Sequence, residues 1–275
     1  MKALSFKDLA AHLVLLALTF ATLYPFFWMI VTSFRPAQEV FTESYSWLPQ
    51  TFTGLAHYIT AFEQAPMLRF MLNGVIVCLG VLVVQLVTAI PCAYALAKFE
   101  FRGAKLLFGA VLLILTVPIQ VPALPLFMAL AELDLLDTYF AMMLPFFLSV
   151  FAIYLFRQTF RAFPDEIIQA ARMEGMGEWE ILWRVVVPSA KPAIAAFAVF
   201  SITAHWNDLY WPLIVITDTS LAPPPLAMMY FADNESGANF GALMASATVL
   251  SAPLILLYLC AQRQFVAGIT MTGVK

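Results

Sequence analysis

Charged residues are scarce in this 275-residue chain: 11% are Asp, Glu, Lys or Arg, whereas 63% are hydrophobic. A soluble globular domain carries about 25% charged residues. A chain with so little charge could not cover its surface in water, so we expect most of that surface to face lipid. The formal net charge of −3 provides no basic surface, and we therefore expect no nucleic-acid partner.

Cysteine is also rare, and Cys78, Cys92 and Cys260 all lie inside apolar runs. A disulfide framework uses paired cysteines in watery loops, so we interpret these three as buried small hydrophobic residues. The sequence has no His, Cys or carboxylate cluster at metal-ligand or triad spacing, which predicts no catalytic residue and no metal site. A phosphate-binding G-x-x-x-x-G-K-[ST] loop is missing too, because residues 268–275 have Val274 in place of the lysine.

Six runs of about 20 mostly apolar residues are long enough to be transmembrane helices. They cover residues 9–32, 70–96, 106–130, 139–160, 192–216 and 240–261. The first run is longer than the apolar stretch of a signal peptide, so we interpret it as a retained span. The sequence therefore predicts an all-α membrane protein with six transmembrane helices.

The basic residues predict how these helices are oriented. Twelve of the 14 lysines and arginines fall on the side of the N-terminus, and only Arg35 and Arg69 fall on the other side. By the positive-inside rule, both termini and the connection over residues 161–191 lie in the cytoplasm. Residues 33–69 and 217–239 then form two long segments on the outer side.

Proline clusters predict two local features. The three consecutive prolines at residues 223–225 predict a stiff, extended strip in the second outer segment. The third run contains Pro118, Pro122 and Pro125 around Gln120. Each interior proline frees a backbone carbonyl, which lipid tolerates where the carbonyl faces protein or water. This second cluster therefore favours the wall of a cavity.

The cytoplasmic connection is patterned as a structured unit. Pro164 and the two acidic residues after it suit the first turn of a helix, and Gly175 and Gly177 suit its end. A second helix is expected over residues 178–187. An amphipathic pair on the membrane surface is one interpretation. The first helix has a small, acidic-leaning surface, which favours docking into a protein groove.

This connection resembles the EAA loop of ABC importer permeases. The family pattern is E-A-A, three residues, Gly, nine residues and I-x-L-P; this chain has Q-A-A from Gln169, three residues, Gly175, nine residues and V-x-V-P ending at Pro188. Glutamine replaces the family's first glutamate. Other stretches resemble the carbohydrate-type importers, above all the second, smaller permease of maltose and glycerol-3-phosphate uptake systems: FRPAQEV, LDTY, HWNDLYWPL and QRQFVAGITMTGVK.

The resemblance implies a single permease domain over residues 1–275 and a set of partners. In that family two different permeases form the pathway as a heterodimer, an ATPase dimer binds underneath, and an extracytoplasmic binding protein delivers the solute. The EAA loop supplies a coupling helix that sits in a groove of the ATPase. ATP and magnesium would bind that ATPase, and no cofactor would bind this chain. The coupling residues implied here are Gln169, Ala170, Ala171, Glu174, Gly175, Met176 and Pro188.

A polar insertion in the fifth run predicts part of a solute path, because intramembrane polar groups face the interior of a helix bundle. Hydroxyl-rich solutes accept hydrogen bonds from such groups and stack on aromatic rings. An alternative is interhelical hydrogen bonding for the polar residues and an interfacial belt for the aromatic ones. The candidates are Trp206, Asn207, Asp208, Tyr210 and, from the third run, Gln120.

The resemblance implies a non-catalytic permease subunit of a binding-protein-dependent importer in the bacterial inner membrane, with a sugar, polyol or similar solute. No lysine or arginine lies in the middle of a run, and binding of an anionic solute usually requires such a cation. One alternative is an anionic solute such as glycerol-3-phosphate, with the cation supplied by the partner permease. Another is an ion-coupled secondary transporter, for which Asp208 would be the main candidate carboxylate.

Overall fold

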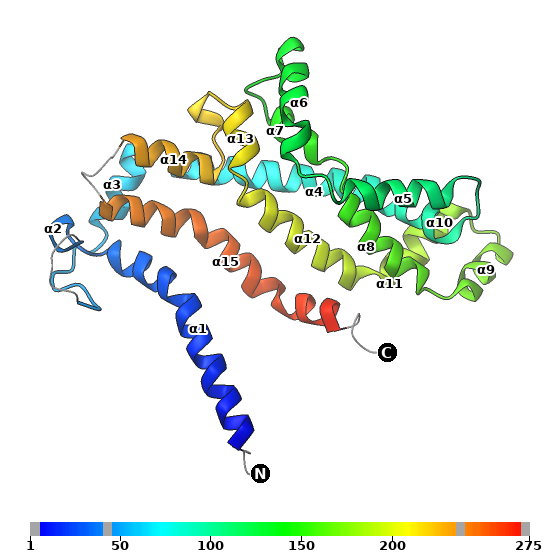
Figure 1. Ribbon diagram of the computed structural model, residues 1–275, viewed down its shortest axis with the longest axis horizontal. Coiled ribbons are helices and arrows are strands. Elements are labelled where there is room, and N and C mark those ends of the chain that lie inside the picture. Colours follow the sequence, from blue (N-terminus) through cyan, green and yellow to red (C-terminus); the bar gives the residue numbers. More distant parts are fainter. Residues whose placement is uncertain (1–5, 41–45, 235–239, 271–275) are drawn as a thin grey trace. The chain divides into compact units, whose positions relative to one another are not determined.

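The computed structural model describes residues 6–40, 46–234 and 240–270, and every regular element among them is helical (Figure 1). Lys2, Lys275 and parts of the two expected outer segments, residues 41–45 and 235–239, lie outside the described residues. By their contacts the residues divide into two compact units, residues 1–67 with 228–252 and residues 68–227 with 253–275. The all-helical class is confirmed, and the single permease domain stays a prediction.

The first unit begins with a long apolar helix. α1 (Phe6–Thr32) is followed by α2 (Ala37–Val40) and α3 (Ala56–Gln64). The segment after α1 folds back on itself, because the Glu39 carboxylate accepts hydrogen bonds from the backbone N–H groups of Gln50 and Thr51 at 3.0 and 2.7 Å.

The second unit contains most of the remaining helices, and α4, α14 and α15 each have residues in both units. The elements are α4 (Met67–Lys98), α5 (Ala104–Ile114), α6 (Gln120–Glu132), α7 (Tyr139–Met143), the 3₁₀ turn η1 (Leu144–Phe146), α8 (Val150–Arg161), α9 (Asp165–Met173), α10 (Glu178–Ile181), the π-helical turn η2 (Leu182–Val186), α11 (Val187–Ser189), α12 (Lys191–Trp206), α13 (Tyr210–Val215), the 3₁₀ turn η3 (Thr219–Leu221), α14 (Pro224–Asn234) and α15 (Phe240–Thr270).

Three helices in the described part of the chain are long and apolar enough to cross a membrane: Lys7–Thr32, Met67–Lys98 and Phe240–Cys260. Two bent pairs could add one crossing each. Tyr139–Phe146 and Val150–Arg161 meet at 46°, and Glu178–Ser189 and Lys191–Trp206 meet at 79°. These count as three to five crossings by length and composition, so the six expected spans stay a prediction.

The expected span over residues 106–130 is divided into α5 and α6. The break falls at residues 115–119 and includes Pro118. A proline has no N–H group for the helix ladder and disfavours the α conformation of the residue before it. The expected span over residues 192–216 is divided in the same way, because α12 ends at Trp206 and α13 begins at Tyr210.

The prediction of an extended strip at residues 223–225 is wrong. Pro224 is instead the first residue of α14. The carbonyl of Pro223 accepts a hydrogen bond from the N–H of Ala227 at 2.9 Å. Proline suits the first turn of a helix because its missing N–H would have no partner there, and its fixed φ angle is already helical.

Asp137 ties the turn before α7 to the turn after α13. Its carboxylate accepts hydrogen bonds from the backbone N–H and hydroxyl of Thr217, both at 2.6 Å, and from the N–H of Asp218 at 2.8 Å. The hydrogen bond from the Thr217 hydroxyl, helped by these N–H groups, holds the pKa of Asp137 below its usual range. This link holds the end of α13, whose first two residues line a cavity, close to the start of α7.

Two glycines of α4 allow close helix packing and provide a matched test. A Cβ atom on Gly74 would lie 2.8 Å from the Pro224 ring and 3.1 Å from the Trp206 ring. A Cβ atom on Gly80 would lie 2.6 Å from the sulfur of Met143, whose flexible side chain can move away.

We expect Gly74→Ala to destabilise the protein by about 1–3 kcal/mol, the usual range for overpacking, and Gly80→Ala to destabilise it less. Thermal unfolding in detergent measures both, and equal losses would contradict this account of the packing.

Candidate functional site

Polar side chains from two helices meet inside the second unit. Ser201 and His205 are four residues apart on α12 and therefore project from the same face of that helix. Gln85 comes from the middle of α4 and is 4% exposed. Its Oε1 accepts a hydrogen bond from the Ser201 hydroxyl at 2.6 Å, and its Nε2 donates to the carbonyl of Phe146 at 2.8 Å. Gln85 Nε2 also lies 3.4 Å from His205 Nε2.

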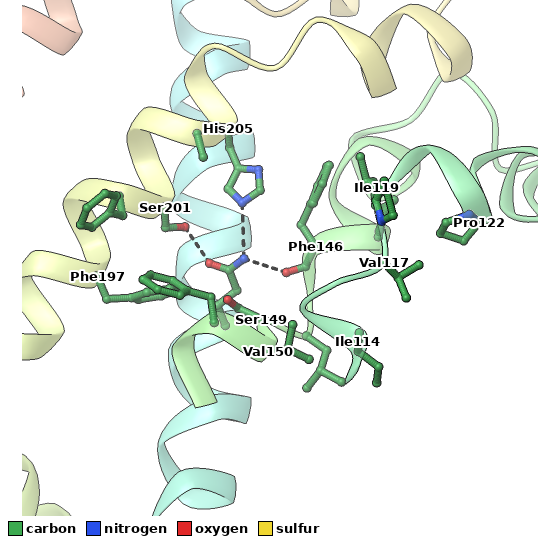
Figure 2. A pocket seen from close by; sticks show the side chains of 17 residues that line it. Ile114, Val117, Ile119, Pro122, Phe146, Ser149, Val150, Phe197, Ser201 and His205 are labelled. Carbon is green, nitrogen blue, oxygen red and sulfur yellow. Dashed lines mark hydrogen bonds between the residues drawn. The ribbon is translucent and has the colours of Figure 1, made fainter. Parts of the chain in front are cut away.

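This polar group borders a cavity of about 520 Å³ (Figure 2). Ser201, His205 and Phe197 of α12 lie on one side of it, and Val117 and Ile119 from the break between α5 and α6 lie across from them. The lining is mostly apolar and aromatic. Its polar side chains are Gln85, Ser149, Ser201 and His205. A mostly apolar cavity with a few convergent polar groups is the usual form of a small-molecule site.

A second cavity of about 310 Å³ adjoins the first and shares Ile119, Phe146, Ala204 and His205 with it. It extends along the residues between α12 and α13, where the helical hydrogen bonding is interrupted. Together the two cavities follow one side of α12 from Phe197 to beyond its C-terminal end.

Three of the five predicted path residues line the second cavity: Asn207, Asp208 and Tyr210. The Asn207 amide donates to the carbonyl of Thr203 at 2.8 Å, and the Asp208 carboxylate accepts from the N–H of Trp211 at 3.4 Å. Trp206 is 4% exposed and lines neither cavity, and its ring packs next to Gly74. Gln120 is exposed at the start of α6 and is also absent from both linings.

Gln85, Ser149 and Ser201 line the larger cavity but are not among the residues predicted from the sequence. Gln85 had a usable signal, because an amide in the middle of a long apolar run should face the bundle interior. Ser149 had a weaker signal, because it is also the N-cap of α8, where its hydroxyl accepts a hydrogen bond from the N–H of Ala152. Among the described residues that line the two cavities, Asp208 provides a carboxylate, and there is neither a lysine nor an arginine.

The second candidate site is the connection after α8, where the expected helix–glycine–helix unit is present. α9 runs from Asp165 to Met173, directly after Pro164. Gly175 follows with a φ angle of +84°. The N–H of Gly175 bonds to the carbonyl of Arg172 at 3.0 Å, and the N–H of Met176 bonds to that of Ala171 at 3.1 Å. This pair of hydrogen bonds is a Schellman motif, which usually places glycine at the left-handed position.

The connection is anchored to the C-terminal end of α4 by two polar clusters. Lys98 donates to the Asp165 carboxylate and to the carbonyl of Phe163, both at 2.6 Å. Glu178 accepts from Arg172 Nε at 2.6 Å and from the Tyr94 hydroxyl at 3.0 Å. Beneath them, apolar side chains of α9, α10 and η2 belong to the same buried cluster as α4: Ile168, Ala171, Ile181, Leu182, Val186, Ile90, Ala93 and Tyr94.

The predicted coupling residues divide between this anchor and the free surface. Ala171 is 7% exposed and Met176 is half-buried. The other five are exposed: Gln169, Ala170, Glu174, Gly175 and Pro188. Beside them the large apolar side chains of Ile167 and Met173 on the same helix are 46% and 85% exposed. The connection is therefore anchored to α4 on its inner side and presents a partly apolar outer face.

Comparison with known proteins points to one family. A family model described as the binding-protein-dependent transport system inner membrane component matches residues 86–271. The chain is 31% identical over 261 residues to the arabinooligosaccharides transport system permease protein AraQ of Halalkalibacterium halodurans, covering 94% of this chain and 93% of that protein. It is 30% identical to the diacetylchitobiose uptake system permease protein NgcG of Streptomyces coelicolor, covering 94% and 86%. It is 29% identical to the sn-glycerol-3-phosphate transport system permease protein UgpE of Yersinia pestis, covering 95% of both chains.

The fold is shared with a solved structure. A chain from the crystal structure of a bacterial ABC transporter involved in the import of the acidic polysaccharide alginate superposes with a TM-score of 0.83 at 22% identity, covering 96% of this chain and 100% of that one. A second alginate transporter structure, in complex with an alginate pentasaccharide-bound periplasmic protein, gives a TM-score of 0.64 at 15% identity, covering 94% and 96%.

Proposed function

Because the chain belongs to the family of binding-protein-dependent transport system inner membrane components, we propose that it is a multi-pass permease subunit of an ABC importer for sugars. It forms half of the translocation path and couples to ATP hydrolysis on a separate chain. Two relatives, AraQ and NgcG, are named as permeases for arabinooligosaccharides and diacetylchitobiose. The observation that carries the proposal is the pair of adjoining cavities, whose few polar groups and aromatic walls suit a hydroxyl-bearing ring.

We propose six membrane spans with both termini and the connection over residues 161–191 in the cytoplasm. In this arrangement α5 and α6 form one broken span around Pro118. Broken helices are tolerated in a membrane where the interrupted backbone lines a cavity, and residues 117–119 line the larger cavity here. The positive-inside distribution of lysine and arginine supports the same orientation.

The connection over residues 161–191 is the proposed ATPase-docking surface. Support comes from its rigid anchor on α4 and from its exposed face, which includes Ala170, Met173 and Gly175. Small residues let another backbone approach closely, and the exposed methionine can adapt to a groove. ATP and magnesium then bind to the ATPase dimer and no cofactor binds to this chain.

Two further partners complete the assembly. A second, homologous permease forms the other half of the path as a heterodimer. An extracytoplasmic solute-binding protein docks on the outer side, where the segment over residues 217–239 includes the exposed side chain of Met229. The surrounding partner is membrane lipid, and the assembly uses no nucleic acid.

An anionic solute is the second candidate, because UgpE is named for sn-glycerol-3-phosphate transport. A buried anion needs a paired cation or several charge-assisted hydrogen bonds. The described residues that line the two cavities offer no lysine or arginine and include the carboxylate of Asp208. This charge distribution favours the neutral sugar.

Co-purification tests the subunit role. We expect the affinity-tagged chain, purified from its native membrane in mild detergent, to retain a Walker-motif ATPase and a second permease. The reason is that the connection has a preformed outer face that needs no folding on binding. Recovery of the tagged chain as a lone subunit, with the ATPase and second permease folded but unbound, would contradict the proposal.

A further inference from the structure

We propose that Gln85, Ser201 and the carbonyl of Phe146 fix His205 as the neutral tautomer that carries its proton on Nδ1. That N–H then serves as a hydrogen-bond donor to a hydroxyl oxygen of the solute. Gln85 is a positioning residue in this scheme, and His205 is the residue that contacts the solute. The inference rests on the proposed transport of a neutral, hydroxyl-bearing solute.

The orientation of the Gln85 amide is set by its two hydrogen-bond partners, Phe146 and Ser201. A backbone carbonyl can only accept hydrogen bonds, so the amide atom that lies 2.8 Å from the Phe146 carbonyl must be the NH₂ nitrogen. The amide oxygen then faces the Ser201 hydroxyl at 2.6 Å, and Ser201 donates to it. A flipped amide would place two acceptors against each other at Phe146.

The tautomer of His205 follows from this orientation. The NH₂ group of Gln85 has a second N–H, and His205 Nε2 lies 3.4 Å from its nitrogen. An amide nitrogen cannot accept a hydrogen bond, so His205 Nε2 must offer its lone pair. A proton on Nε2 would place two donors against each other. The proton of the neutral ring is therefore on Nδ1.

The free N–H group is available to a solute. His205 lines both cavities, at the point where they adjoin. Figure 2 shows the hydrogen bond between one ring nitrogen of His205 and the Gln85 amide as a dashed line, and the other ring nitrogen points away from that amide. Within the described part of the chain, no hydrogen bond occupies Nδ1. The ring of Phe146 lies beside the imidazole, with ring centroids 4.5 Å apart, and limits its rotation.

A single neutral donor suits a transport path. A sugar hydroxyl can accept from the His205 N–H, while the aromatic rings that line the same cavity, those of Phe146, Phe151, Phe197 and Phe200, cover its apolar C–H faces. Asn207 and Asp208 provide acceptors in the adjoining cavity for hydroxyl protons. Conduction requires binding that is strong enough for entry and weak enough for release. A neutral donor meets this requirement better than a charged one.

Nitrogen-15 NMR of the purified complex in lipid nanodiscs measures the tautomer directly. The chain has three histidines, His12, His57 and His205, so the signals of a selectively labelled sample can be assigned by single substitutions. We expect a protonated Nδ1 and an unprotonated Nε2 for His205. Gln85→Glu replaces the donor by a carboxylate that accepts, and should move the proton to Nε2. A wild-type His205 protonated on Nε2 would overturn the proposal, whether or not the complex transports sugar.

Transport kinetics test the role of the donor. We expect His205→Ala to lower kcat/KM for ATP-driven sugar uptake about tenfold, which corresponds to one lost hydrogen bond. The amide nitrogen of asparagine can occupy the position of Nδ1, so His205→Asn should stay within about threefold of wild type, whereas His205→Leu should match the alanine variant. Equal rates for the asparagine and leucine variants in an assembled, ATP-hydrolysing complex would refute the donor role. Failure of the wild-type complex to use ATP at all would instead refute the proposed function.

Discussion

Substitution of Gly175 by valine is expected to reduce ATPase retention more than tenfold while the chain still inserts in the membrane. Gly175 has a φ angle of +84°, where an L-residue is strained by about 1–2 kcal/mol and a β-branched residue by more. Space is not the reason, because a Cβ atom there would meet nothing within 4 Å in this chain. Valine would instead force the backbone out of the Schellman motif and change the direction of the chain between α9 and α10.

Gly177 is the matched control for this prediction. It is also a glycine of the connection with nothing within 4 Å of an added Cβ, but its φ and ψ angles are −76° and 159°. Valine readily adopts this extended conformation. ATPase recovered per tagged permease is the measurement, and Gly177→Val should stay within about twofold of wild type. A Gly175→Val protein that retains the ATPase as well as wild type would show that the turn does not set the docking surface.

Substitution of Glu178 by alanine is expected to uncouple ATP hydrolysis from transport. Glu178 joins Arg172 of α9 to Tyr94 of α4, and its loss would free one end of the connection. Hydrogen bonds to charged groups contribute about 1.5–3 kcal/mol when buried. The Arg172 and Glu178 side chains are each 41% exposed, so solvent screening reduces this to about 1 kcal/mol. We expect the solute transported per ATP to fall severalfold, because the ATPase would move a loosened loop rather than α4.

Glu180 tests whether the position of the carboxylate matters. It lies two residues further along α10 and pairs with Arg184 one helical turn away, on the exposed side. An exposed pair at this spacing contributes about 0.3–0.5 kcal/mol and does not connect to α4. Glu180→Ala should therefore leave the ratio of transport to ATP hydrolysis unchanged. The same loss of coupling in both variants would contradict the role assigned to Glu178.

The sequence was most informative where structure depends on neighbouring residues. The start of α9 after Pro164 and its end at Gly175 follow from backbone preferences that act over a few residues, and both were predicted. The residues at 223–225 show the limit of such reasoning, because proline suits both an extended strip and the first turn of a helix. The choice at Pro224 depends on the hydrogen bond that Ala227 makes to Pro223 once α14 forms.

The candidate cavity was harder to predict, because the residues that line it lie far apart in the sequence. Gln85 and Ser201 are separated by 116 positions, and no local pattern shows that their side chains meet. Asn207, Asp208 and Tyr210 were found because polar residues interrupt an apolar run there. Trp206, next to them in the sequence, points to a buried contact beside Gly74. The direction of each side chain is set by the end of α12, which the sequence did not locate.

ATP-dependent uptake into proteoliposomes tests the central claim most directly. The purified permease pair, its ATPase and its solute-binding protein would be reconstituted with a radiolabelled neutral oligosaccharide, with ATP and magnesium on the ATPase side and no ion gradient. The account predicts accumulation of the sugar that requires ATP and stops when the ATPase is omitted. Uptake by the permease alone that follows a proton or sodium gradient and ignores ATP would contradict it and identify an ion-coupled transporter.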